Sequence, residues 1–411
     1  MKILFLTDNF PPESNAPAIR TFEHTREWVK AGHEVTVLTC APNFPRGRVY
    51  EGYRNRLFQR EEIEGIRVVR VWSWIAANEG SLKRILDYMS FMLSAVVASL
   101  FLKRPDVVIG TSPQFFTAAA AWMVGKLKRR PWVFELRDLW PETILAVGAM
   151  KKGRLVEAIE RFADFLYRDA DLVVPVTDSF ARHLEQVGVD PERIVVVTNG
   201  IEPGQHVPER APAAVREHWG IPADAFVAGY IGTAGLCHGL SAVLDAAVLL
   251  QGDRGFHFAL MGDGADKDEL REIARERKLE NVTIIDGQPR QAALELLNAV
   301  DVSLVVLKNS PLFETVIPSK IFEAMELRKP ILIGVRGESR KIVVDEVGCG
   351  VAFPPEDAEA MAAALQRLAR DDEERQRLAQ RGGEALVERF RRSALAAKML
   401  AALEALVRSR H

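Results

Sequence analysis

The strongest constraint on the fold is a repeated pattern in which a short apolar run ends in a polar or glycine-rich turn and a helical segment follows. Ile3–Leu6 is such a run, Ala18–Ala31 has the pattern of a helix, and Val35–Thr39 is the next apolar run. The pattern recurs at Phe226–Ile231, which precedes a glycine-rich turn and a helical segment at Ser241–Leu250. A strand, a helix and a parallel strand in succession form a βαβ unit. The sequence therefore predicts an α/β protein with doubly wound sheets.

The length of 411 residues is too great for one ordinary hydrophobic core and indicates two domains. Pro203-Gly204 and the proline-containing segment 208–212 have the composition of a linker. We therefore expect a first domain at residues 1–202 and a second at residues 213–389. The alanine- and leucine-rich tail from Ser393 to Arg410 predicts a helix.

Charge and cysteine content narrow the functional class. A net charge of −2 gives no general attraction to nucleic acid. Cys40, Cys237 and Cys349 are scattered and odd in number, which argues against a disulfide framework or a zinc site and fits a reducing cytoplasm. The residues after Met1 become polar too soon for a signal peptide. Asp169-Ala-Asp171 and Asp266-Lys-Asp268 have the spacing of a metal-binding loop, but they enter a buried strand and a helix, so we expect no metal or other cofactor.

The segment Thr315–Val335 predicts a helix followed by a buried strand. Pro318 and Ser319 are typical of a helix start, with Ser319 as the N-cap, and apolar residues at 321, 322 and 325 form one face. Pro330 ends the helix, and the apolar run 331–333 reads as a buried strand. Arg328 stands where a left-handed residue can end such a helix, at a cost of about 1 kcal/mol relative to glycine.

Lys320 and Glu323 fall in the first turn of this predicted helix, beside free backbone N–H groups. A lysine at a helix N-terminus suits a phosphate, and a carboxylate just behind it suits the hydroxyl groups of a ribose or a sugar. The alternative is that the two residues are only an i,i+3 pair on a surface helix.

Three turns follow predicted strands in the second half, and the first two have the glycine-rich composition of a nucleotide site. The first, Gly232–Leu240, has a strand before it and a helix after it, an arrangement that cradles a diphosphate on backbone N–H groups. It lacks the GxGxxG spacing and so does not indicate NAD. The second turn contains Gly262, Asp263 and Gly264, and the third contains Gln288.

In the first half, polar residues follow two predicted strands. Arg137, Asp138 and Glu142 come after the run 132–136, and the carboxyl ends of parallel strands face the ligand cleft. The alternative is an Arg–Asp pair that stabilises the loop. Asn15-Ala16 lies in the loop after the first strand, where the alternative is an ordinary βα loop.

Two segments of the first half could contact a membrane. Arginines, among them Arg46 and Arg48, alternate with aromatic residues between Asn43 and Arg60, and such a run could contact lipid headgroups, a pyrophosphate or only solvent. Tyr88–Leu102 is uncharged and is flanked by basic residues. Its 15 residues are too few to span roughly 30 Å of hydrocarbon. It is either a core helix or a helix with one face on the inner membrane surface.

These motifs resemble those of family-4 glycosyltransferases over essentially the whole chain. The resemblance rests on residues 8–12, 42–45 and 137–142, and on the segment Thr315–Glu323, which contains Pro-Ser-Lys. It implies the GT-B fold, in which two Rossmann-like domains face a cleft, and a C-terminal helix at residues 390–411 that packs back on the first domain. This sequence departs from the family where Arg137 replaces a histidine and where Thr233 and His238 stand near the positions of an arginine and a lysine.

The resemblance also implies the roles of the site residues. The catalytic candidates are Arg137, Asp138, Lys320 and Glu314, which stands beside the first position of the motif. The donor-binding candidates are Gly232, Thr233, Gly235, His238, Gly262, Asp263, Gly264, Gln288, Ser319, Lys320 and Glu323. The acceptor-side candidates are Asn15, Ala16, Arg46 and Arg48.

The function implied by the resemblance is a retaining, metal-independent transfer of a sugar from a UDP-sugar to a polyprenyl-diphosphate-linked saccharide. The transfer reaction would take place at the inner face of the cytoplasmic membrane, in O-antigen or capsule synthesis. The nearest branch of the family transfers N-acetyl-L-fucosamine. A UDP-sugar 2-epimerase and a non-catalytic nucleotide-sugar-binding scaffold remain alternatives. The basic and apolar segments of the first half count against the epimerase, which needs no membrane surface.

Overall fold

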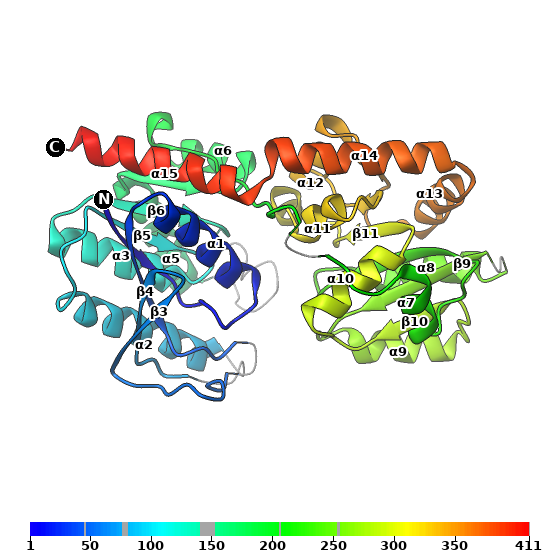
Figure 1. Cartoon of the computed structure of the whole chain (residues 1–411), viewed down its shortest axis with the longest axis horizontal. Coiled ribbons are helices and arrows are strands. Elements are labelled where there is room, and N and C mark those ends of the chain that lie inside the picture. Colours follow the sequence, from blue (N-terminus) through cyan, green and yellow to red (C-terminus); the bar gives the residue numbers. More distant parts are fainter. Residues whose placement is uncertain (45–46, 76–80, 140–152, 205–206, 253–254, 411) are drawn as a thin grey trace. The chain divides into compact units, whose positions relative to one another are not determined.

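The computed structural model describes the chain except for residues 45–46, 76–80, 140–152, 205–206, 253–254 and 411 (Figure 1). The chain divides into two compact units. The first unit consists of Met1–Asn199 and Arg392–His411, and the second consists of Gly200–Arg391. We describe each unit by itself.

The first unit is built on a seven-stranded sheet in the order β3-β4-β2-β1-β5-β6-β7. Its strands are β1 (Lys2–Leu6), β2 (Glu34–Cys40), β3 (Phe58–Ile63), β4 (Ile66–Val71), β5 (Val107–Thr111), β6 (Trp132–Leu136) and β7 (Leu172–Pro175). All neighbouring strands are parallel except β3, which pairs antiparallel with β4. The central strands are apolar on both faces because helices cover both faces of the sheet.

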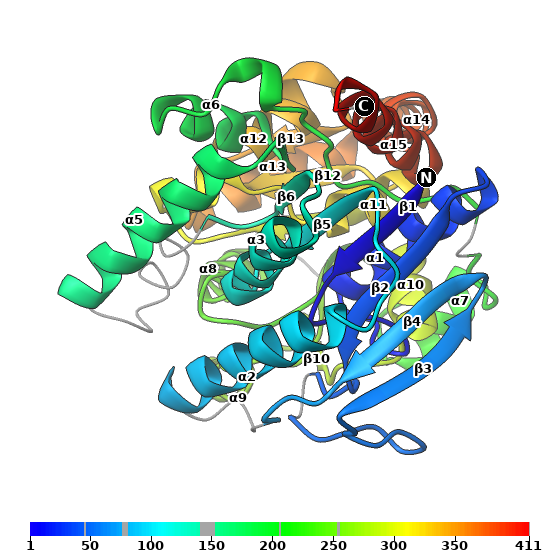
Figure 2. The same ribbon diagram turned by 90° about the vertical axis from the view of Figure 1, so that its left-hand side faces the viewer.

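The helices of the first unit are α1 (Ala16–Lys30), α2 (Ser81–Ser99), α3 (Phe115–Lys128), α5 (Arg154–Asp169), α6 (Asp178–Gln186), the 3₁₀ turn η1 (Pro191–Arg193) and α15 (Arg392–Ser409). α1 and α15 cover one face of the sheet, where Trp28 donates a hydrogen bond from Nε1 to the carbonyl of Ala396 at 2.9 Å. α2 and α3 lie side by side on the other face (Figure 2). The last long helix of the chain thus belongs to the first unit.

The second unit is built on a six-stranded, fully parallel sheet in the order β10-β9-β8-β11-β12-β13. Its strands are β8 (Phe226–Ile231), β9 (Phe256–Met261), β10 (Val282–Ile285), β11 (Val302–Val306), β12 (Ile331–Gly334) and β13 (Gly350–Ala352). Its helices are α7 (Pro212–His218), α8 (Ser241–Leu250), α9 (Lys267–Glu276), α10 (Arg290–Ala299), α11 (Lys320–Glu326), α12 (Glu338–Arg340), α13 (Ala358–Arg370) and α14 (Asp372–Arg389), with the 3₁₀ turn η2 (Pro311–Thr315) and the π-helical turn η3 (Lys341–Glu346).

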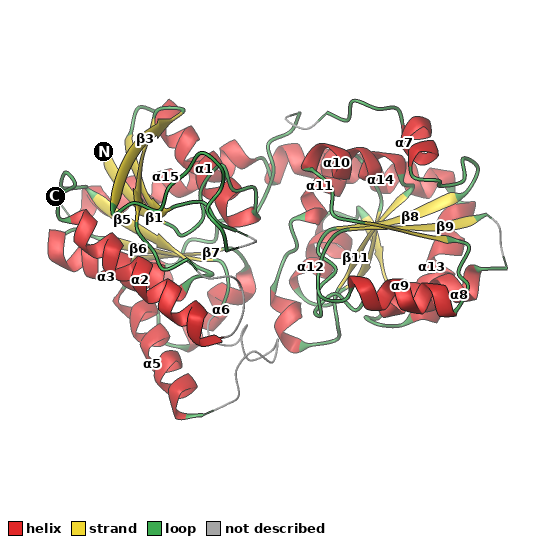
Figure 3. Cartoon of the chain, turned by 90° about the horizontal axis from the view of Figure 1, so that it is seen from below, coloured by secondary structure: helices red, strands yellow, loops and turns green. Residues whose placement is uncertain are grey.

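Alternating side chains of the second sheet pack on its two faces, one cluster on one face and two clusters on the other. Val227, Ala259 and Ile331 point to the face covered by α7, α10, α11 and α14, whereas Ala228 and Phe258 point to the face covered by α8, α9 and α13 (Figure 3). The predicted α/β architecture with two parallel-sheet, Rossmann-like domains is confirmed, apart from the antiparallel edge strand β3.

Three local predictions were wrong or incomplete. The hairpin β3–β4 was not predicted, because the one arginine and two glutamates of β3 hide its period-2 pattern. The apolar run 194–197 has the composition of a strand, but it forms only an isolated bridge beside β7, with hydrogen bonds from the N–H groups of Val195 and Val197. Ser319 precedes α11 as predicted, but its backbone is already helical and its side chain makes no capping hydrogen bond.

The end of α11 follows the prediction. Arg328 has φ of +51°, the left-handed conformation that glycine adopts most easily. The helix therefore stops before Pro330, and β12 begins at Ile331 as a fully buried strand. Within the described parts of the chain, no helix combines the length and the apolar character that a bilayer-crossing span requires.

Candidate functional site

The central feature of the second unit is a buried lysine without a hydrogen-bond partner. The Nζ atom of Lys320 is buried, and none of the described residues hydrogen-bonds to it. It lies 3.6 Å from the centre of the Tyr230 ring, and a side-chain carbon added at Gly232 would stand only 2.8 Å from it. Lys320, at the start of α11, thus reaches the turn after β8.

Burial lowers the pKa of Lys320 to about 7, although the nearby carboxylate of Glu323 opposes this shift. A buried ammonium group without a hydrogen-bond partner is costly for a fold. The ring of Tyr230 offsets part of this cost through a cation–π contact. An anionic ligand at the Gly232 turn would supply the missing partner.

Tyr230 also fixes the turn itself. Its hydroxyl group donates a hydrogen bond to the carbonyl oxygen of Thr233 at 2.7 Å, and burial raises the pKa of the phenol. One aromatic side chain of β8 therefore holds both the lysine and the backbone of the turn.

The glycines of the first two turns allow the turns to pack together. The N–H of Gly232 donates to Met261, and that of Ala234 donates to Asp263, both at 2.9 Å. A side-chain carbon at Gly262 would stand 1.7 Å from the carbonyl oxygen of Gly232, and one at Gly264 would stand 2.1 Å from that of Ala234. The space beside these glycines is therefore filled by the first turn, and the N–H groups of Gly232 and Ala234 are already engaged.

His238 shapes the same turn as a neutral side chain. The N–H of Gly235 donates to its Nδ1 atom at 3.3 Å. Burial, together with the charge of Lys320, lowers the pKa of His238 to about 4. Near neutral pH, therefore, Lys320 and not His238 provides positive charge at the turn.

Glu323 does not form a simple surface pair with Lys320. Its carboxylate lies 3.6 Å from Nη2 of Arg290, at the start of α10, and Nε of Arg290 is buried with no hydrogen-bond partner in the described structure. Arg290 was not predicted from the sequence as a site residue, although its position just after the turn that contains Gln288 could have indicated one. The carboxylate of Glu323 thus lies close to two cationic side chains.

In the first unit, the loop after β6 holds a second pair of partly buried charged residues, Arg137 and Asp138. The hydroxyl oxygen of Ser112 accepts hydrogen bonds from the N–H groups of Arg137 and Asp138, at 2.7 and 3.1 Å. Nε and Nη1 of Arg137 are buried without a hydrogen-bond partner among the described residues. Burial lowers the pKa of Arg137, and it raises the pKa of Asp138 to about 6 against the effect of Arg137.

Asp8, which follows β1, joins this region. Burial raises the pKa of its carboxyl group, which senses the charge of Arg137. The end of the β6 strand thus presents an unsatisfied guanidinium and a carboxyl group poised near neutral pH, a combination that is frequent at functional sites.

Comparison with known proteins identifies both halves of the chain. Residues 16–200 match the family described as "Glycosyl transferase 4-like domain", and residues 213–385 match "Glycosyl transferases group 1". The chain belongs to the group 1 glycosyltransferases.

Individual relatives agree with this assignment. The chain is 29% identical over 380 residues to the putative colanic acid biosynthesis glycosyl transferase WcaI of Escherichia coli K12, covering 89% of this chain and 92% of that protein. It is 27% identical over 287 residues to the probable glycosyltransferase WbjE of Pseudomonas aeruginosa, covering 68% and 70%. The structure of HepE from Anabaena, in complex with UDP and glucose, has a TM-score of 0.72 at 19% identity and covers 98% of this chain and 99% of that one. The GT-B fold is therefore confirmed.

The remaining donor-side candidates of this glycosyltransferase lie at the surface. Asp263 binds Lys267 at 2.7 Å, and Lys267 also binds Asp286 at 2.8 Å. Gln288 donates to the carbonyl of Asp286 at 3.2 Å, and the side chains of Thr233 and Ser319 are exposed.

Glu314 lies in η2, and its carbonyl oxygen occupies the place that a side chain at Gly337 would take, 2.0 Å away. Gly337 has φ of +67°, so both its space and its backbone favour glycine.

The acceptor-side candidates have mainly structural contacts. Asn15 caps α1, because its Oδ1 accepts from the N–H of Ala18 at 3.0 Å, while its Nδ2 donates to Asn9 at 2.5 Å. This geometry fits an ordinary βα loop. Ala16 and Arg48 are exposed, and Arg46 and Glu142 lie outside the described residues.

A buried polar network in the first unit was missed altogether. Arg20 and Glu135 form an ion pair at 2.9 Å with both side chains 1% exposed. Arg20 also donates to the carbonyls of Val197 and Thr198 at 2.9 and 2.8 Å. Arg20 was not singled out in the sequence, because a charged residue in α1 has the appearance of a solvated one, but its side chain holds the chain segment that leaves the first unit.

Within the described residues, no group of three or more His, Cys, Asp or Glu side chains could hold a metal ion. The two Asp-x-Asp segments have other contacts. Asp169 binds Lys126 at 2.9 Å, and Asp171 accepts from the N–H of Trp132 at 3.0 Å. Asp266 and Asp268 stand at the start of α9.

Proposed function

We propose that this glycosyltransferase moves a sugar from a UDP-sugar to a polyprenyl-diphosphate-linked saccharide, with retention of the anomeric configuration. The observation that carries the proposal is the buried, unpartnered ammonium of Lys320 beside the Gly232 turn. A donor diphosphate would supply the hydrogen-bond partner that this group lacks among the described residues and add negative charge beside it. As the sugar bond breaks, negative charge grows on the leaving UDP, and a fixed, desolvated cation stabilises that charge more than water does.

Glu323 is proposed to bind hydroxyl groups of the donor. Its carboxylate is partly exposed and is held by Arg290 at 3.6 Å. A carboxylate can accept two hydrogen bonds from neighbouring hydroxyls of a ribose or sugar. Because Lys320 and Glu323 share the first turn of α11, the same element would position both the phosphate and the sugar end of the donor.

In the first unit, Arg137 and Asp138 are proposed to contact substrate. The unsatisfied guanidinium of Arg137 suits a phosphate or a donor sugar. Asp138, whose pKa is about 6, suits the hydroxyl group of an acceptor, which it would orient for attack. No metal is assigned a role, because Lys320 and Arg137 provide the positive charge.

The comparisons support a role in surface polysaccharide synthesis. The relative from Escherichia coli is named for colanic acid biosynthesis, LpsE of Rhizobium meliloti, 28% identical over 253 residues, is named for lipopolysaccharide core biosynthesis, and HepE binds UDP. From the sequence resemblance, UDP-N-acetyl-L-fucosamine is the first donor to test.

The lipid-linked acceptor places the proposed reaction at the inner face of the cytoplasmic membrane. α2 supports this placement, because one face of it is exposed and apolar. The exposed side chains include Leu86 (47%), Met89 (39%), Leu93 (55%) and Val97 (56%), which recur at helical spacing. An apolar face of this kind suits the interface of a bilayer.

UDP release tests the proposal. Purified protein and detergent-solubilised membranes would be offered a panel of UDP-hexosamines and UDP-6-deoxyhexosamines, with and without EDTA. We expect release that needs one UDP-sugar and the lipid fraction, persists in EDTA and is lost in Glu323→Ala. Glu272→Ala, on the exposed side of α9, is the matched control and should retain activity.

Other outcomes would point to other functions. Interconversion of UDP-sugars without an acceptor would indicate the epimerase. Binding of UDP with no lipid-dependent release from any donor would indicate a nucleotide-sugar-binding scaffold.

A further inference from the structure

Two cavities of the first unit lie between α2 and the edge hairpin, away from the candidate site. One has a volume of about 520 Å³ and an almost wholly apolar wall, formed by Leu57, Phe58, Arg60, Leu93, Ser94, Val97, Ala98 and Phe101. The other has a volume of about 560 Å³, and its wall includes Lys2, Leu4, Glu34, Thr36, Arg60, Glu61, Glu62, Arg67, Val69, Phe101 and Lys103. Arg60 and Phe101 belong to both walls, so we name the two cavities together the α2–β3 trough.

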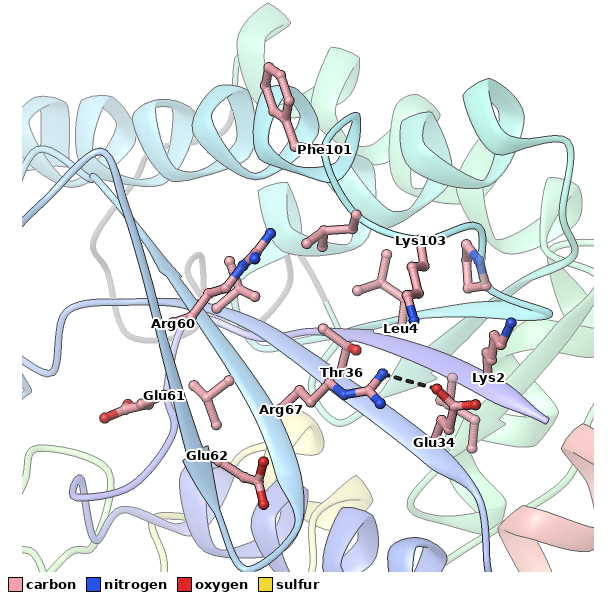
Figure 4. A pocket seen from close by; sticks show the side chains of 15 residues that line it. Lys2, Leu4, Glu34, Thr36, Arg60, Glu61, Glu62, Arg67, Phe101 and Lys103 are labelled. Carbon is pink, nitrogen blue, oxygen red and sulfur yellow. Dashed lines mark hydrogen bonds and ion pairs between the residues drawn. The ribbon is translucent and has the colours of Figure 1, made fainter.

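The charges on the wall of the second cavity that are not neutralised by an ion pair are mainly positive. Arg67 binds Glu34 at 2.9 Å, and Glu61 binds Arg70 on the other face of β3. The cations left on the wall are Lys2, Arg60 and Lys103, and the carboxylate left is Glu62. Among the described residues, neither Arg60 nor Lys103 forms an ion pair. Figure 4 shows Arg60 from β3 and Lys103 from the segment after α2 extending towards the same cavity.

The apolar cavity is open and has exposed walls. Leu57 is 81% exposed, Val97 is 56% exposed and Phe101 is 72% exposed. The exposed face of α2 continues directly from this wall through Leu93 and Met89. An occupant must therefore combine an apolar chain with an anionic group. It must also be present at the membrane surface that is proposed to cover the apolar face of α2.

We propose that the α2–β3 trough binds one anionic phospholipid, with an acyl chain in the apolar cavity and the phosphate between Arg60 and Lys103. Burial of the chain removes apolar surface from water, and the two cations attract the phosphate.

The position in the sheet favours a membrane phospholipid over the lipid-linked acceptor. Lys2, Glu34 and Arg67 stand at the amino ends of their parallel strands, whereas Asp8 and Arg137 follow carboxyl ends. The cavity that would hold the phosphate is thus at the opposite ends of the parallel strands from the candidate catalytic residues of this unit. The lipid would anchor and orient the first unit and would not be glycosylated there.

A soluble, monomeric lipid separates a discrete site from general adsorption to a membrane. Calorimetry would titrate the purified full chain with dihexanoyl-phosphatidylglycerol, below its micelle concentration, and with dihexanoyl-phosphatidylcholine. We expect saturable binding of one lipid per chain, tighter for phosphatidylglycerol.

Two variants test the two parts of the trough. Ser94→Phe fills the apolar cavity without making the surface more polar. It should raise the dissociation constant of both lipids roughly tenfold, a loss of about 1.4 kcal/mol of binding free energy. Arg60→Gln should remove the preference for phosphatidylglycerol. Leu127→Phe on α3 and Arg161→Gln on α5, both at exposed positions, are the matched controls and should bind as the parent protein does.

The absence of saturable binding, or equal binding by Ser94→Phe, would overturn the inference. If thermal melting shows that Ser94→Phe does not fold, the test rests on Arg60→Gln, and an unchanged preference for phosphatidylglycerol in that variant would refute the site. Equal affinity of the parent protein for the two lipids would likewise refute it. The inference rests on the membrane contact proposed above. Because lipid binding needs no donor or acceptor, its failure is distinguishable from a failure of sugar transfer, which the UDP-release assay reports.

Discussion

Binding of a UDP-sugar should weaken as the pH rises above about 7, because Lys320 then loses its proton in the unliganded protein. Burial moves the pKa of this side chain from its ordinary value of 10.5 to about 7. One pKa unit corresponds to about 1.4 kcal/mol, so burial takes roughly 5 kcal/mol from the charged form. A donor diphosphate beside Nζ favours the charged form again and raises the pKa in the complex.

The expected effect has a definite sign and size. If only the protonated lysine binds the diphosphate, the dissociation constant increases about tenfold between pH 6 and pH 8. Binding at pH 8 must also take up a proton. Calorimetry in two buffers of different ionisation enthalpy measures both quantities. A UDP-sugar is the suitable ligand, because its diphosphate has no group that titrates in this range.

Variants assign the effect to one side chain. Lys320→Arg keeps its charge throughout and should bind with little dependence on pH. Lys329→Met removes another lysine whose pKa burial lowers, but Lys329 lies beyond the other end of α11, so the tenfold effect should remain. Asp138→Asn is a second control, since the pKa of Asp138 is about 6. The reasoning is refuted if the affinity of the parent protein is constant from pH 6 to pH 8, or if Lys320→Arg shows the same pH dependence.

Three further predictions concern the same structure. Lys320→Met should abolish donor binding but raise the free energy of unfolding of the unliganded protein, because it removes a buried charge that has no hydrogen-bond partner among the described residues. The gain should be at most the roughly 5 kcal/mol derived above from the pKa shift. Since the unfolded chain binds more protons than the folded chain between the two pKa values, the gain should be full below pH 7 and shrink as the pH rises towards 10.5. Thermal melts at several pH values measure this. Tyr230→Leu should weaken donor binding by about 2 kcal/mol through loss of the cation–π contact, whereas Tyr230→Phe, which keeps the ring, should cost about 1 kcal/mol of stability; equal affinities in the two variants would contradict the role of the ring. Asn15→Ala should lower the free energy of unfolding by about 1 kcal/mol through loss of the α1 cap and leave UDP release unchanged; a loss of release at unchanged thermal stability would instead indicate contact with the acceptor.

The strands of both sheets were predictable where the apolar runs were continuous and bounded. β6, β8 and α8 have the predicted bounds, and β12 begins at the predicted residue. Runs of this kind are buried on both faces, so their sequence alone specifies the element. β3 escaped because an edge strand needs no apolar run, and charged residues at an edge are common.

The site was predictable in its motifs but not in its interactions. The positions of Lys320 and Glu323 were read from the first turn of a helix. That Tyr230 holds the lysine and that Arg290 faces the glutamate depends on contacts between elements 30 to 90 residues apart in the sequence. The amphipathic pattern of α1 likewise gave no sign that Arg20 is buried, because an inward-facing charge looks like a solvated one until its partner, Glu135, is placed.

Each unit holds a buried cation that its own fold does not satisfy, and this shared property is the physical argument for substrate sites in both. Lys320 has no hydrogen-bond partner in the described part of the second unit, and Arg137 has two unsatisfied nitrogens in that of the first. By contrast, Arg20, whose side chain is only 1% exposed, is satisfied by Glu135 and by backbone carbonyls, as a structural residue is. Buried polar groups are normally paired, and an unpaired one lowers stability. In a transferase whose donor carries a diphosphate, the two unsatisfied cations are therefore best explained as groups that a substrate completes.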